Sequence, residues 1–303
     1  MDVLVVGASG LIGRHVVARL RAGGHGATSV ARTARDGVDH VLDATTAAEA
    51  DFRAVLAGHD GVVFAAGADD REVPGKPAYP VFHRGNVAPV VRLLTAAREE
   101  GLTRAAVLGS YYTHFHRLHP EWRLAERHPY IRSRVEQARA GREAAGPDLP
   151  VAVLELPFVF GRAGDRLPNW AGPLDRWVRS RSPLLAPPGG SAATSAAQVA
   201  GHVVDVLERA SGEDLAVATE NLTWRDMIGR IASAAGHPRA VRGVPGAVAR
   251  AALRLTGLAH AARGRQAGID PAHADVLLLR ELFVPPSGPG SLDDAIAETF
   301  PRD

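Results

Sequence analysis

The chain has 303 residues, of which 46% are hydrophobic and 22% are charged, which is ample material for one large core or two coupled ones. It contains no cysteine, so disulfides, thiolate nucleophiles and cysteine-ligated zinc are excluded. The formal net charge is only +2, with basic and acidic residues interspersed, which argues against a nucleic-acid partner. Among 35 basic residues only Lys76 is a lysine, so any role that usually needs lysine falls to arginine.

No apolar run reaches the roughly 18 to 20 residues that span a bilayer. Met1 and Asp2 lead directly into an apolar run, and no charged leader precedes that run. These features predict a cytoplasmic protein with no membrane partner.

Short apolar runs alternate with amphipathic stretches of helical length as far as about residue 218, which is typical of βαβ units. Strands in such a sheet are covered on both faces and should be apolar throughout, as residues 3–6 are. We therefore predict an α/β fold with a Rossmann-type, doubly wound parallel sheet. Its expected strands are 2–6, 27–30, 40–42, 61–65, 105–108, 151–156 and 215–218, and its expected helices are 11–21, 47–56, 87–100, 131–145 and 197–210.

The composition changes after Pro157. Pro, Gly and Arg become frequent over residues 162–190, and the pattern beyond Glu220 is mainly helical, with helices expected at 224–235, 246–255, 272–282 and 292–300. This predicts a Rossmann domain of residues 1–160 plus 196–219, and a smaller, mainly helical C-terminal lobe of residues 161–195 plus 220–303. A substrate cleft is expected between the two.

Three glycines, Gly7, Gly10 and Gly13, lie between the first expected strand and the first expected helix. Gly7 permits a tight turn, Gly10 lets the backbone approach a pyrophosphate, and Gly13 lets the helix pack closely on the strand. A purely structural glycine turn is disfavoured by this position in a βαβ array. The loop therefore predicts a nicotinamide dinucleotide site with contacts from Gly7, Ser9, Gly10, Leu11, Ile12 and Gly13.

The choice between NAD and NADP depends on the end of the second strand. An acid there would bind the ribose 2′-hydroxyl of NAD, whereas an arginine would pair with the 2′-phosphate of NADP. The position holds no acid, so Arg32, with Arg14 or Arg35 nearby, favours NADP(H). The alternative is that Arg32 is a solvated surface residue. Other expected cofactor contacts are an acid after the third strand and small residues ending the fourth, namely Asp43, Ala65, Ala66 and Gly67.

With these features, Asn86 and the segment 130–134, the chain resembles an extended or atypical short-chain dehydrogenase/reductase of the NAD-dependent epimerase/dehydratase superfamily. Residues 86–97, 156–161 and 292–296 resemble that family's fourth crossover helix, the loop after its sixth strand and its final helix. The resemblance covers almost the whole chain. It implies a homodimer as a reasonable assembly, and cofactor contacts at Pro157 and Phe160.

The resemblance also implies three catalytic roles. Tyr130 matches the tyrosine that exchanges a proton with the reacting oxygen, and Arg134 stands where the family has a lysine that holds the nicotinamide ribose. The resemblance therefore implies that Tyr130 and Arg134 also contact the cofactor. Ser110 is our choice for the hydroxyl that orients the carbonyl, with Tyr111 and Thr113 as alternatives. Capping the end of the strand is a competing role for Ser110.

Tyr130 and Arg134 are four residues apart and share a helix face. A cation within about 4 to 6 Å would lower a tyrosine pKa from near 10 by about one to three units. Arginine cannot pass on a proton, however, so a relay through lysine would be lost. The arginine-rich composition favours retained chemistry despite this substitution.

A run with His114, His116 and His119 is expected to be a loop that lines the substrate cleft, and we expect no metal site there. Glu155 departs from an arginine often found in the family, which weakens a sugar-nucleotide assignment. The leading hypothesis is an NADP(H)-dependent oxidoreductase acting on a ketone or aldehyde, or on the alcohol, of a mid-sized organic substrate. The alternatives are a nucleotide-sugar epimerase that uses NAD(P) transiently and a catalytically silent NADP(H)-binding sensor.

Overall fold

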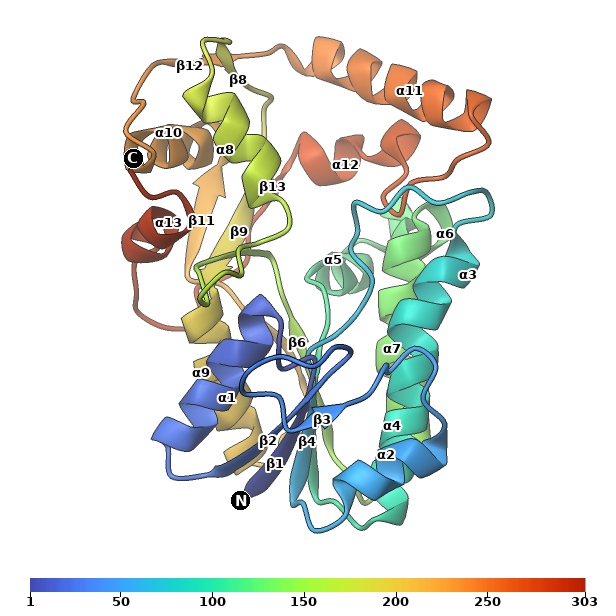
Figure 1. The fold of residues 1–303 in the computed structure, drawn as a ribbon. Helices are drawn as coiled ribbons and strands as arrows, with labels where there is room; N and C mark the ends of the chain where they lie inside the picture. The colour runs from blue at the N-terminus through green and yellow to red at the C-terminus, as the bar shows by residue number, and fades with distance from the viewer. Residues whose placement is uncertain (303) are drawn as a thin grey trace.

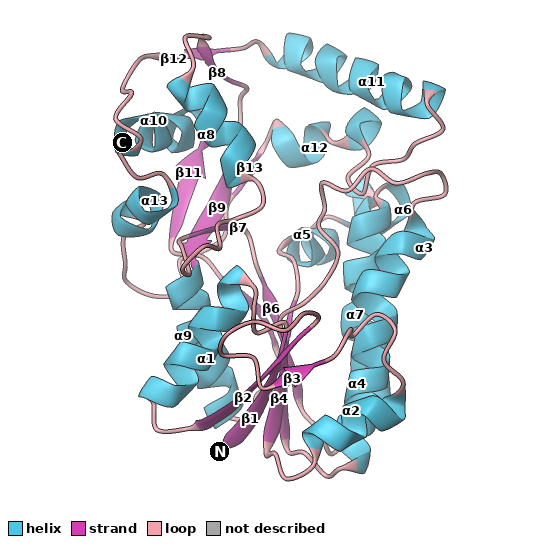
Figure 2. Ribbon diagram, viewed as in Figure 1, coloured by secondary structure: helices cyan, strands magenta, loops and turns pink. Residues whose placement is uncertain are grey.

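The computed structural model describes residues 1–302 and contains one large parallel sheet with helices on both faces (Figures 1 and 2). The strand order is β10-β6-β5-β4-β1-β2-β3, and all of its pairings are parallel. The predicted Rossmann-type sheet is confirmed, and every predicted strand is present with its ends within two residues. The strands are β1 (Asp2–Val6), β2 (Gly26–Ala31), β3 (His40–Val41), β4 (Gly61–Phe64), β5 (Arg104–Leu108), β6 (Val151–Glu155) and β10 (Asp214–Ala216).

Two hydrophobic cores explain why the sheet's strands lack polar alternation. In β1, Leu4 and Val6 belong to one core, whereas Val3 and Val5 belong to the other. The first core is closed by α2 (Glu49–Leu56), α4 (Ala88–Glu99) and α7 (Pro129–Ala145), and the second by α1 (Leu11–Ala22) and α9 (Ala196–Glu208). Since both sides of each strand are buried, apolar residues are required at consecutive positions.

Short elements extend from the carboxyl edge of the sheet. Ser195 caps the start of α9, where its side chain accepts a hydrogen bond from the N–H of Gln198. A π-helical turn, η1 (His83–Val87), precedes α4, and such turns are frequent at functional sites. The remaining short elements are α3 (Tyr79–Phe82), α5 (Tyr112–Leu118), η2 (Pro120–Trp122) and α6 (Leu124–Arg127).

The C-terminal part packs over the carboxyl edge and holds two small sheets that the sequence did not predict. In one, β9 (Gly190–Ser195) pairs with β7 (Phe158–Phe160), β11 (Glu220–Thr223) and β13 (Glu281–Leu282). In the other, β8 (Leu184–Ala186) pairs with β12 (Val241–Gly243). Every residue of β9 is buried although most are Ser, Ala or Thr, so its sequence carries neither an apolar run nor an alternating pattern.

The helices of this part are α8 (Ala171–Arg179), α10 (Trp224–Ala234), α11 (Gly246–Ala262), η3 (Pro271–His273), α12 (Asp275–Leu278) and α13 (Asp293–Thr299). Two predictions need correction. The helix expected at 272–282 is only η3 and α12, because the chain then turns into β13. The histidine-containing run expected as a loop is helix α5. Within residues 1–302, no helix combines the length and apolarity that crossing a membrane requires.

The packing of α1 on β1 leads to a first prediction. A Cβ added at Gly13 would lie 2.2 Å from the carbonyl oxygen of Gly7, and backbone cannot yield at that distance. We expect Gly13→Ala to lower the free energy of unfolding by at least about 2 kcal/mol, measured by urea denaturation. Gly201→Ala in α9 is the matched control, because no atom lies within 4 Å of its added Cβ. That control should be neutral or stabilising by roughly 0.5 to 1 kcal/mol, and equal effects in the two variants would contradict the packing argument.

Candidate active site

The glycine loop connects β1 to α1 at the carboxyl edge of the sheet. Gly7 has a φ of +88°, and a Cβ there would lie 2.7 Å from the carbonyl carbon and oxygen of Ala65. Gly10 precedes α1 without a side-chain cap, so the N–H groups of the first turn stay open toward an anion. The loop therefore has the close backbone approach and the helix terminus that a pyrophosphate needs.

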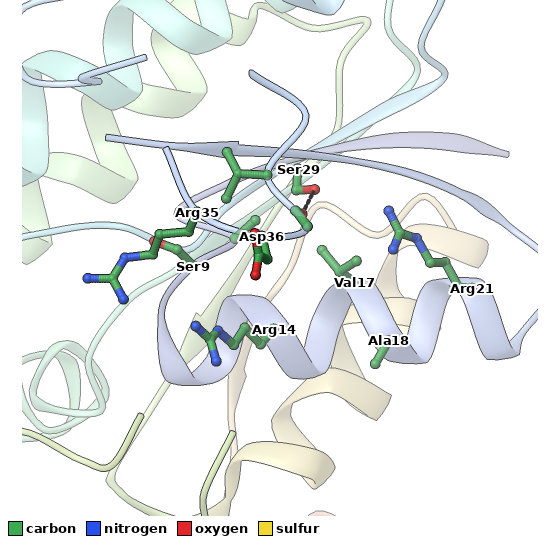
Figure 3. Close-up of a pocket in the computed structure, with 11 residues that line it drawn as sticks. Ser9, Arg14, Val17, Ala18, Arg21, Ser29, Arg35 and Asp36 are labelled. Carbon is green, nitrogen blue, oxygen red and sulfur yellow. Dashed lines mark hydrogen bonds between the residues drawn. The ribbon is translucent and has the colours of Figure 1, made fainter. Parts of the chain in front are cut away.

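A cavity of about 740 Å³ borders this loop (Figure 3). Ser9, Arg14 and Arg35 lie at one end of it and Arg21 at the other. Arg32, the residue expected to select the cofactor, does not line the cavity. Arg32 is exposed and close enough to Asp43 to lower the pKa of that carboxyl, behind the larger effect of the hydrogen bonds from Thr45. The cations beside the glycine loop at this cavity are thus Arg14 and Arg35, with Arg21 at the far end.

An acidic loop residue reaches across to these two arginines. One carboxylate oxygen of Asp165 lies 3.0 Å from Arg14 Nη1, and the other lies 3.5 Å from Arg35 Nη1. The neighbouring Arg166 donates from Nε to the main-chain oxygen of Ser9 at 3.2 Å. The loop after β7 therefore contacts the glycine loop directly, and no pattern in the sequence predicts this contact.

The structure brings the three predicted catalytic residues together. Tyr130 is 7% exposed at the start of α7, and the guanidinium carbon of Arg134 lies 5.1 Å from the centre of its ring. Ser110 follows β5, is 4% exposed and lies close enough to the phenol to lower its pKa. These three groups meet at the carboxyl ends of β4 and β5.

A buried hydrogen-bond network fixes Arg134. Its Nη1 donates to the main-chain oxygen of Leu108 at 3.2 Å and to Oε1 of Gln137 at 3.0 Å. Gln137 donates in turn to the main-chain oxygen of Asn86. The side chain of Asn86 accepts from the N–H of Ala68 at 2.8 Å, so α7, η1 and the loop after β4 are joined. The guanidinium is therefore held at one place on the sheet edge.

Gly67 is the point where the loop after β4 passes over this guanidinium. A Cβ at Gly67 would lie 2.7 Å from Asn86 Oδ1 and 3.1 Å from Arg134 Nη2, and its φ is +152°. Only glycine fits both the space and the backbone conformation there.

Burial raises the pKa of Tyr130 above its ordinary value of 10.0. The positive charge of Arg134 opposes this increase, and so do the hydrogen-bonding interactions with Arg134 and Ser110. Arg134 acts in the direction that the sequence predicted, but the expected net decrease is wrong, because loss of hydration outweighs one nearby cation here. The phenol is consequently protonated at neutral pH.

The alternatives to Ser110 have other partners. The hydroxyl of Tyr111 hydrogen-bonds Ser191 Oγ in β9 at 2.8 Å. The hydroxyl of Thr113 contacts the carboxylate of Glu155 and donates to the main-chain oxygen of Ser110. Of the three candidates, Ser110 is the one whose side chain interacts with Tyr130.

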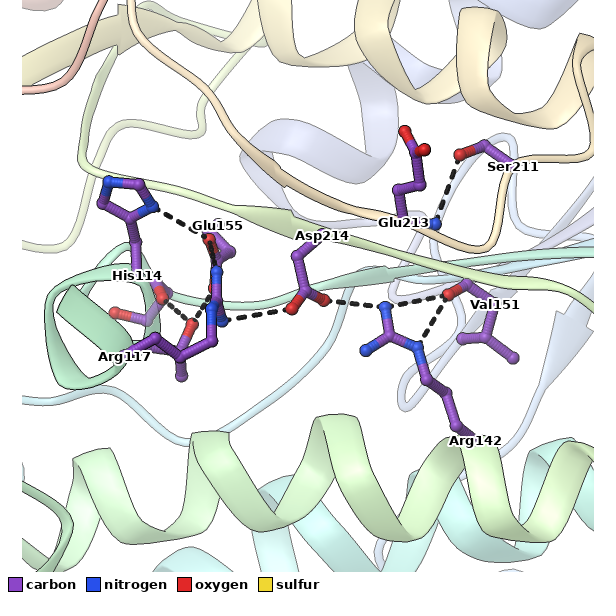
Figure 4. Close-up of polar contacts among 10 residues, drawn as sticks. His114, Arg117, Arg142, Val151, Glu155, Ser211, Glu213 and Asp214 are labelled. Atoms are coloured by element: carbon purple, nitrogen blue, oxygen red, sulfur yellow. Dashed lines mark hydrogen bonds and ion pairs between the residues drawn. The ribbon is translucent and has the colours of Figure 1, made fainter.

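Glu155, at the end of β6, is part of a line of charged groups (Figure 4). It is 1% exposed and accepts two hydrogen bonds from Arg117, at 2.7 and 2.8 Å. Arg117 also pairs with Asp214, which pairs with Arg142 on α7. His114 of α5 lies 3.8 Å from Glu155, and burial lowers its pKa. A carboxylate this deeply buried requires such partners, so Glu155 has a structural role.

Asp70 lies near the candidate catalytic tyrosine, and the sequence reasoning missed it. Burial raises its pKa to about 6, the neighbouring Asp69 adds to the increase, and the charges of Arg71 and Arg134 oppose it. Its charge also raises the pKa of Tyr130, so it lies within electrostatic reach of the phenol. The available signal was the Asp69-Asp70 pair two residues after Gly67.

The segment that follows α11 closes the site beside Asp70. The main-chain oxygen of Gly268 accepts from the N–H of Tyr130 at 3.1 Å, and its N–H donates to the oxygen of Glu72 at 3.0 Å. The N–H of Lys76 donates to the oxygen of Gly264 at 2.9 Å. Residues 264–268 therefore link the loop after β4 to the candidate catalytic tyrosine.

Two further expected cofactor contacts, Pro157 and Phe160, lie at the two ends of β7. The side chain of Phe160 is fully buried and packs on Trp170 with ring centres 5.0 Å apart. Pro157, just before β7, is partly exposed. Within residues 1–302, no group of three or more histidine or acidic side chains is arranged to hold a metal ion.

Comparison with known proteins identifies the family. Residues 3–178 match the model of the NAD dependent epimerase/dehydratase family, so the chain belongs to that family. It is accordingly an NAD(P)-dependent enzyme of the short-chain dehydrogenase/reductase type. No curated protein matches the chain.

Solved structures share the fold over nearly the whole length. The crystal structure of gox2253 has a TM-score of 0.76 at 16% identity and covers 98% of this chain and 96% of its own. WbmH of Bordetella bronchiseptica, solved with NAD+, has a TM-score of 0.70 at 11% identity over 98% and 96%. UDP-N-acetylglucosamine 4-epimerase from Bacillus cereus has a TM-score of 0.65 at 15% identity over 99% and 98%. At these identities the likeness shows the fold alone.

The raised pKa of Asp70 leads to a pH-dependent stability prediction. A carboxyl whose pKa is about 6 when folded, against an ordinary 3.8, stabilises the fold fully below pH 3.8 and loses that contribution as the pH rises through 6. We expect Asp70→Asn to raise the free energy of unfolding by roughly 1 kcal/mol at pH 7, with little effect near pH 4.

Urea unfolding at both pH values measures this difference. Asp148→Asn is the control, because Asp148 is an exposed acid outside the site. A difference between wild type and Asp70→Asn that stays constant across the two pH values would show that the folded-state pKa of Asp70 is not raised.

Proposed function

We propose that the protein is an NADP(H)-dependent oxidoreductase that reduces a ketone or aldehyde of a mid-sized organic substrate. The observation that carries this proposal is the buried phenol of Tyr130, which interacts with both Ser110 and Arg134 at the sheet edge where the glycine loop lies. A proton donor, a carbonyl-orienting hydroxyl and a fixed cation are the groups that carbonyl reduction requires from the protein.

The residues present fit a dinucleotide. A Cβ at either Gly7 or Gly13 would meet backbone closer than 3 Å, and α1 offers open N–H groups to the pyrophosphate. When bound, the nicotinamide supplies the hydride that reduces the carbonyl carbon. Gly67 leaves room beside Arg134, whose guanidinium would hold the nicotinamide ribose in place of the family's lysine.

Tyr130 then acts as the acid. The carbonyl oxygen gains negative charge during reduction and takes the phenolic proton, while Ser110 donates a hydrogen bond to the same oxygen. Arg134 stabilises the phenolate left on Tyr130, and exchange with solvent restores its proton. Burial keeps the pKa of Tyr130 above 10.0, so at neutral pH the residue is the phenol that can donate a proton and not the phenolate that would remove one from an alcohol, which favours reduction.

The preference for NADP(H) is supported by Arg14 and Arg35, which face the cavity beside Ser9 and are held together by Asp165. A 2′-phosphate carries more charge than a carboxylate and has more acceptor oxygens, so it would replace Asp165 between the two guanidinium groups. The exposed ion pairs that it displaces contribute little stability.

This exchange of anions predicts the effect of Asp165→Asn. The variant should bind NADPH about three- to tenfold more tightly than the wild type, because the competing carboxylate is gone, while the affinity for NADH stays unchanged. Fluorescence titration with both nucleotides measures the two dissociation constants, with Asp148→Asn as the control. Tighter binding of NADH than NADPH by the wild type would contradict the proposed preference.

The catalytic assignment predicts a large loss in Tyr130→Phe. Consumption of NADPH across a panel of aldehydes and ketones, followed at the reduced nicotinamide absorbance band, first identifies a substrate. Tyr130→Phe should then lower kcat by at least about a hundredfold, because the proton donor is removed. NADPH affinity should be unchanged, and Tyr79→Phe in α3 is the matched control. Arg134→Lys should keep most of the activity because it retains a cation at this position, whereas Arg134→Ala should lose the activity.

Two outcomes would replace this assignment. Isomerisation of a nucleotide sugar without net change in the cofactor would make the protein an epimerase. Tight NADPH binding with no turnover of any carbonyl or nucleotide sugar would make it a sensor. Undiminished carbonyl reduction by Tyr130→Phe would remove Tyr130 from the mechanism.

A further inference from the structure

Helix α11 lies along the edge of the molecule farthest from the N-terminus (Figure 1). All 17 of its residues keep some exposure. Its large apolar side chains are among the most exposed of the protein: Val248 at 57%, and Leu255 and Leu258 at 67% each. A surface helix normally turns such residues toward the core.

The outward side of α11 is the apolar one. Val248, Leu255 and Leu258 follow helical spacing, and the exposed Ala251 and Ala262 continue the same stripe. The inward side consists of residues that are less exposed, including Ala249, Leu253 and Gly257. A Cβ at Gly257 would come within 3.3 Å of the main-chain nitrogen of Ala272, so small size is what this side needs to pack on η3.

The exposed apolar side chains of the protein gather at this end. Besides the three on α11, Leu185 on β8 is 44% exposed, and β8 pairs with β12 just before α11 begins. Together they are four of the six large hydrophobic side chains that are exposed in residues 1–302. We call these four residues the α11 apolar face. Clustered exposure of this kind marks an interaction surface.

Positive charge lies beside the α11 apolar face. Residues 240–265 contain five arginines and no aspartate or glutamate. Arg250 and Arg254 lie on one flank of the apolar stripe, and both are exposed, as are Arg242 and Arg263 near the two ends of the helix. Arg250 makes one ion pair, 3.2 Å from Asp275. The surface thus combines an apolar stripe with a basic border.

We propose that the α11 apolar face docks on an anionic lipid surface. A helix about 25 Å long, lying flat, would place its apolar stripe at the level of the acyl chains while its arginines pair with phosphate headgroups. A second copy of the chain fits less well, because two such faces would bring arginines together and supply no acids between the helices. This docking departs from the expectation of no membrane partner, which rested on the lack of an apolar run long enough to span a bilayer.

Co-sedimentation of the full chain with vesicles tests the proposal. We expect partitioning onto vesicles of equal parts phosphatidylglycerol and phosphatidylcholine to exceed that onto pure phosphatidylcholine by about tenfold or more at low ionic strength. High salt should reduce this difference, because it screens the arginines. The double variant Leu255→Ser, Leu258→Ser should lose at least about tenfold in partitioning, and Arg254→Gln should lose part of the dependence on anionic lipid.

Leu118→Ser is the matched control, because Leu118 is 58% exposed on α5, away from α11. It should partition as the wild type does. Circular dichroism verifies that the variants are folded. Three results would overturn the proposal: no preference for anionic vesicles, equal binding by the double variant, or a dimer in sedimentation velocity that the double variant dissociates. A dimer of this kind would show that the α11 apolar face binds a second copy of the chain. Because no readout depends on catalysis, these outcomes are independent of the proposed activity.

Discussion

The buried guanidinium of Arg134 is the constraint around which the candidate site is built. A cation that is 8% exposed must be matched by acceptors, and Leu108 on β5 and Gln137 on α7 provide them. Gln137 also binds the backbone of Asn86, so the requirement extends to the π-helical turn and to the loop after β4. One buried charge therefore sets the relative positions of three segments, and these segments place the phenol, the hydroxyl and the glycine loop together.

The sheet could be predicted from the sequence because its strands are buried on both faces, and this requires consecutive apolar residues such as those of β1. The strands of the C-terminal part could not be predicted from the sequence. β9 is built of small residues that fit closely against β11, where a Cβ at Gly190 would lie 2.4 Å from the oxygen of Leu222. Such a strand is specified by its neighbours in space and carries no pattern of its own. The same is true of β13, which ends a stretch with helical periodicity.

In the site, spacing along the chain was enough to predict that Tyr130 and Arg134 share a helix face and that the glycines form one loop. Spacing along the chain could not predict contacts between distant segments. Asp165 reaches Arg14 from 151 residues along the chain, and Asp70 acquires its raised pKa only because folding buries it. The net pKa of Tyr130 depends on that same burial, which a sequence does not quantify.

The scarcity of lysine gives the loop after β4 a practical property. Lys76 is the only lysine in the chain, it is exposed, and its backbone N–H is bound to Gly264 in the segment that contacts Tyr130. An amine-reactive fluorophore therefore has a single side-chain target in this chain. A single dye can thus be placed at the border of the candidate cleft without mutation, where its emission would report on movement between the two segments during turnover.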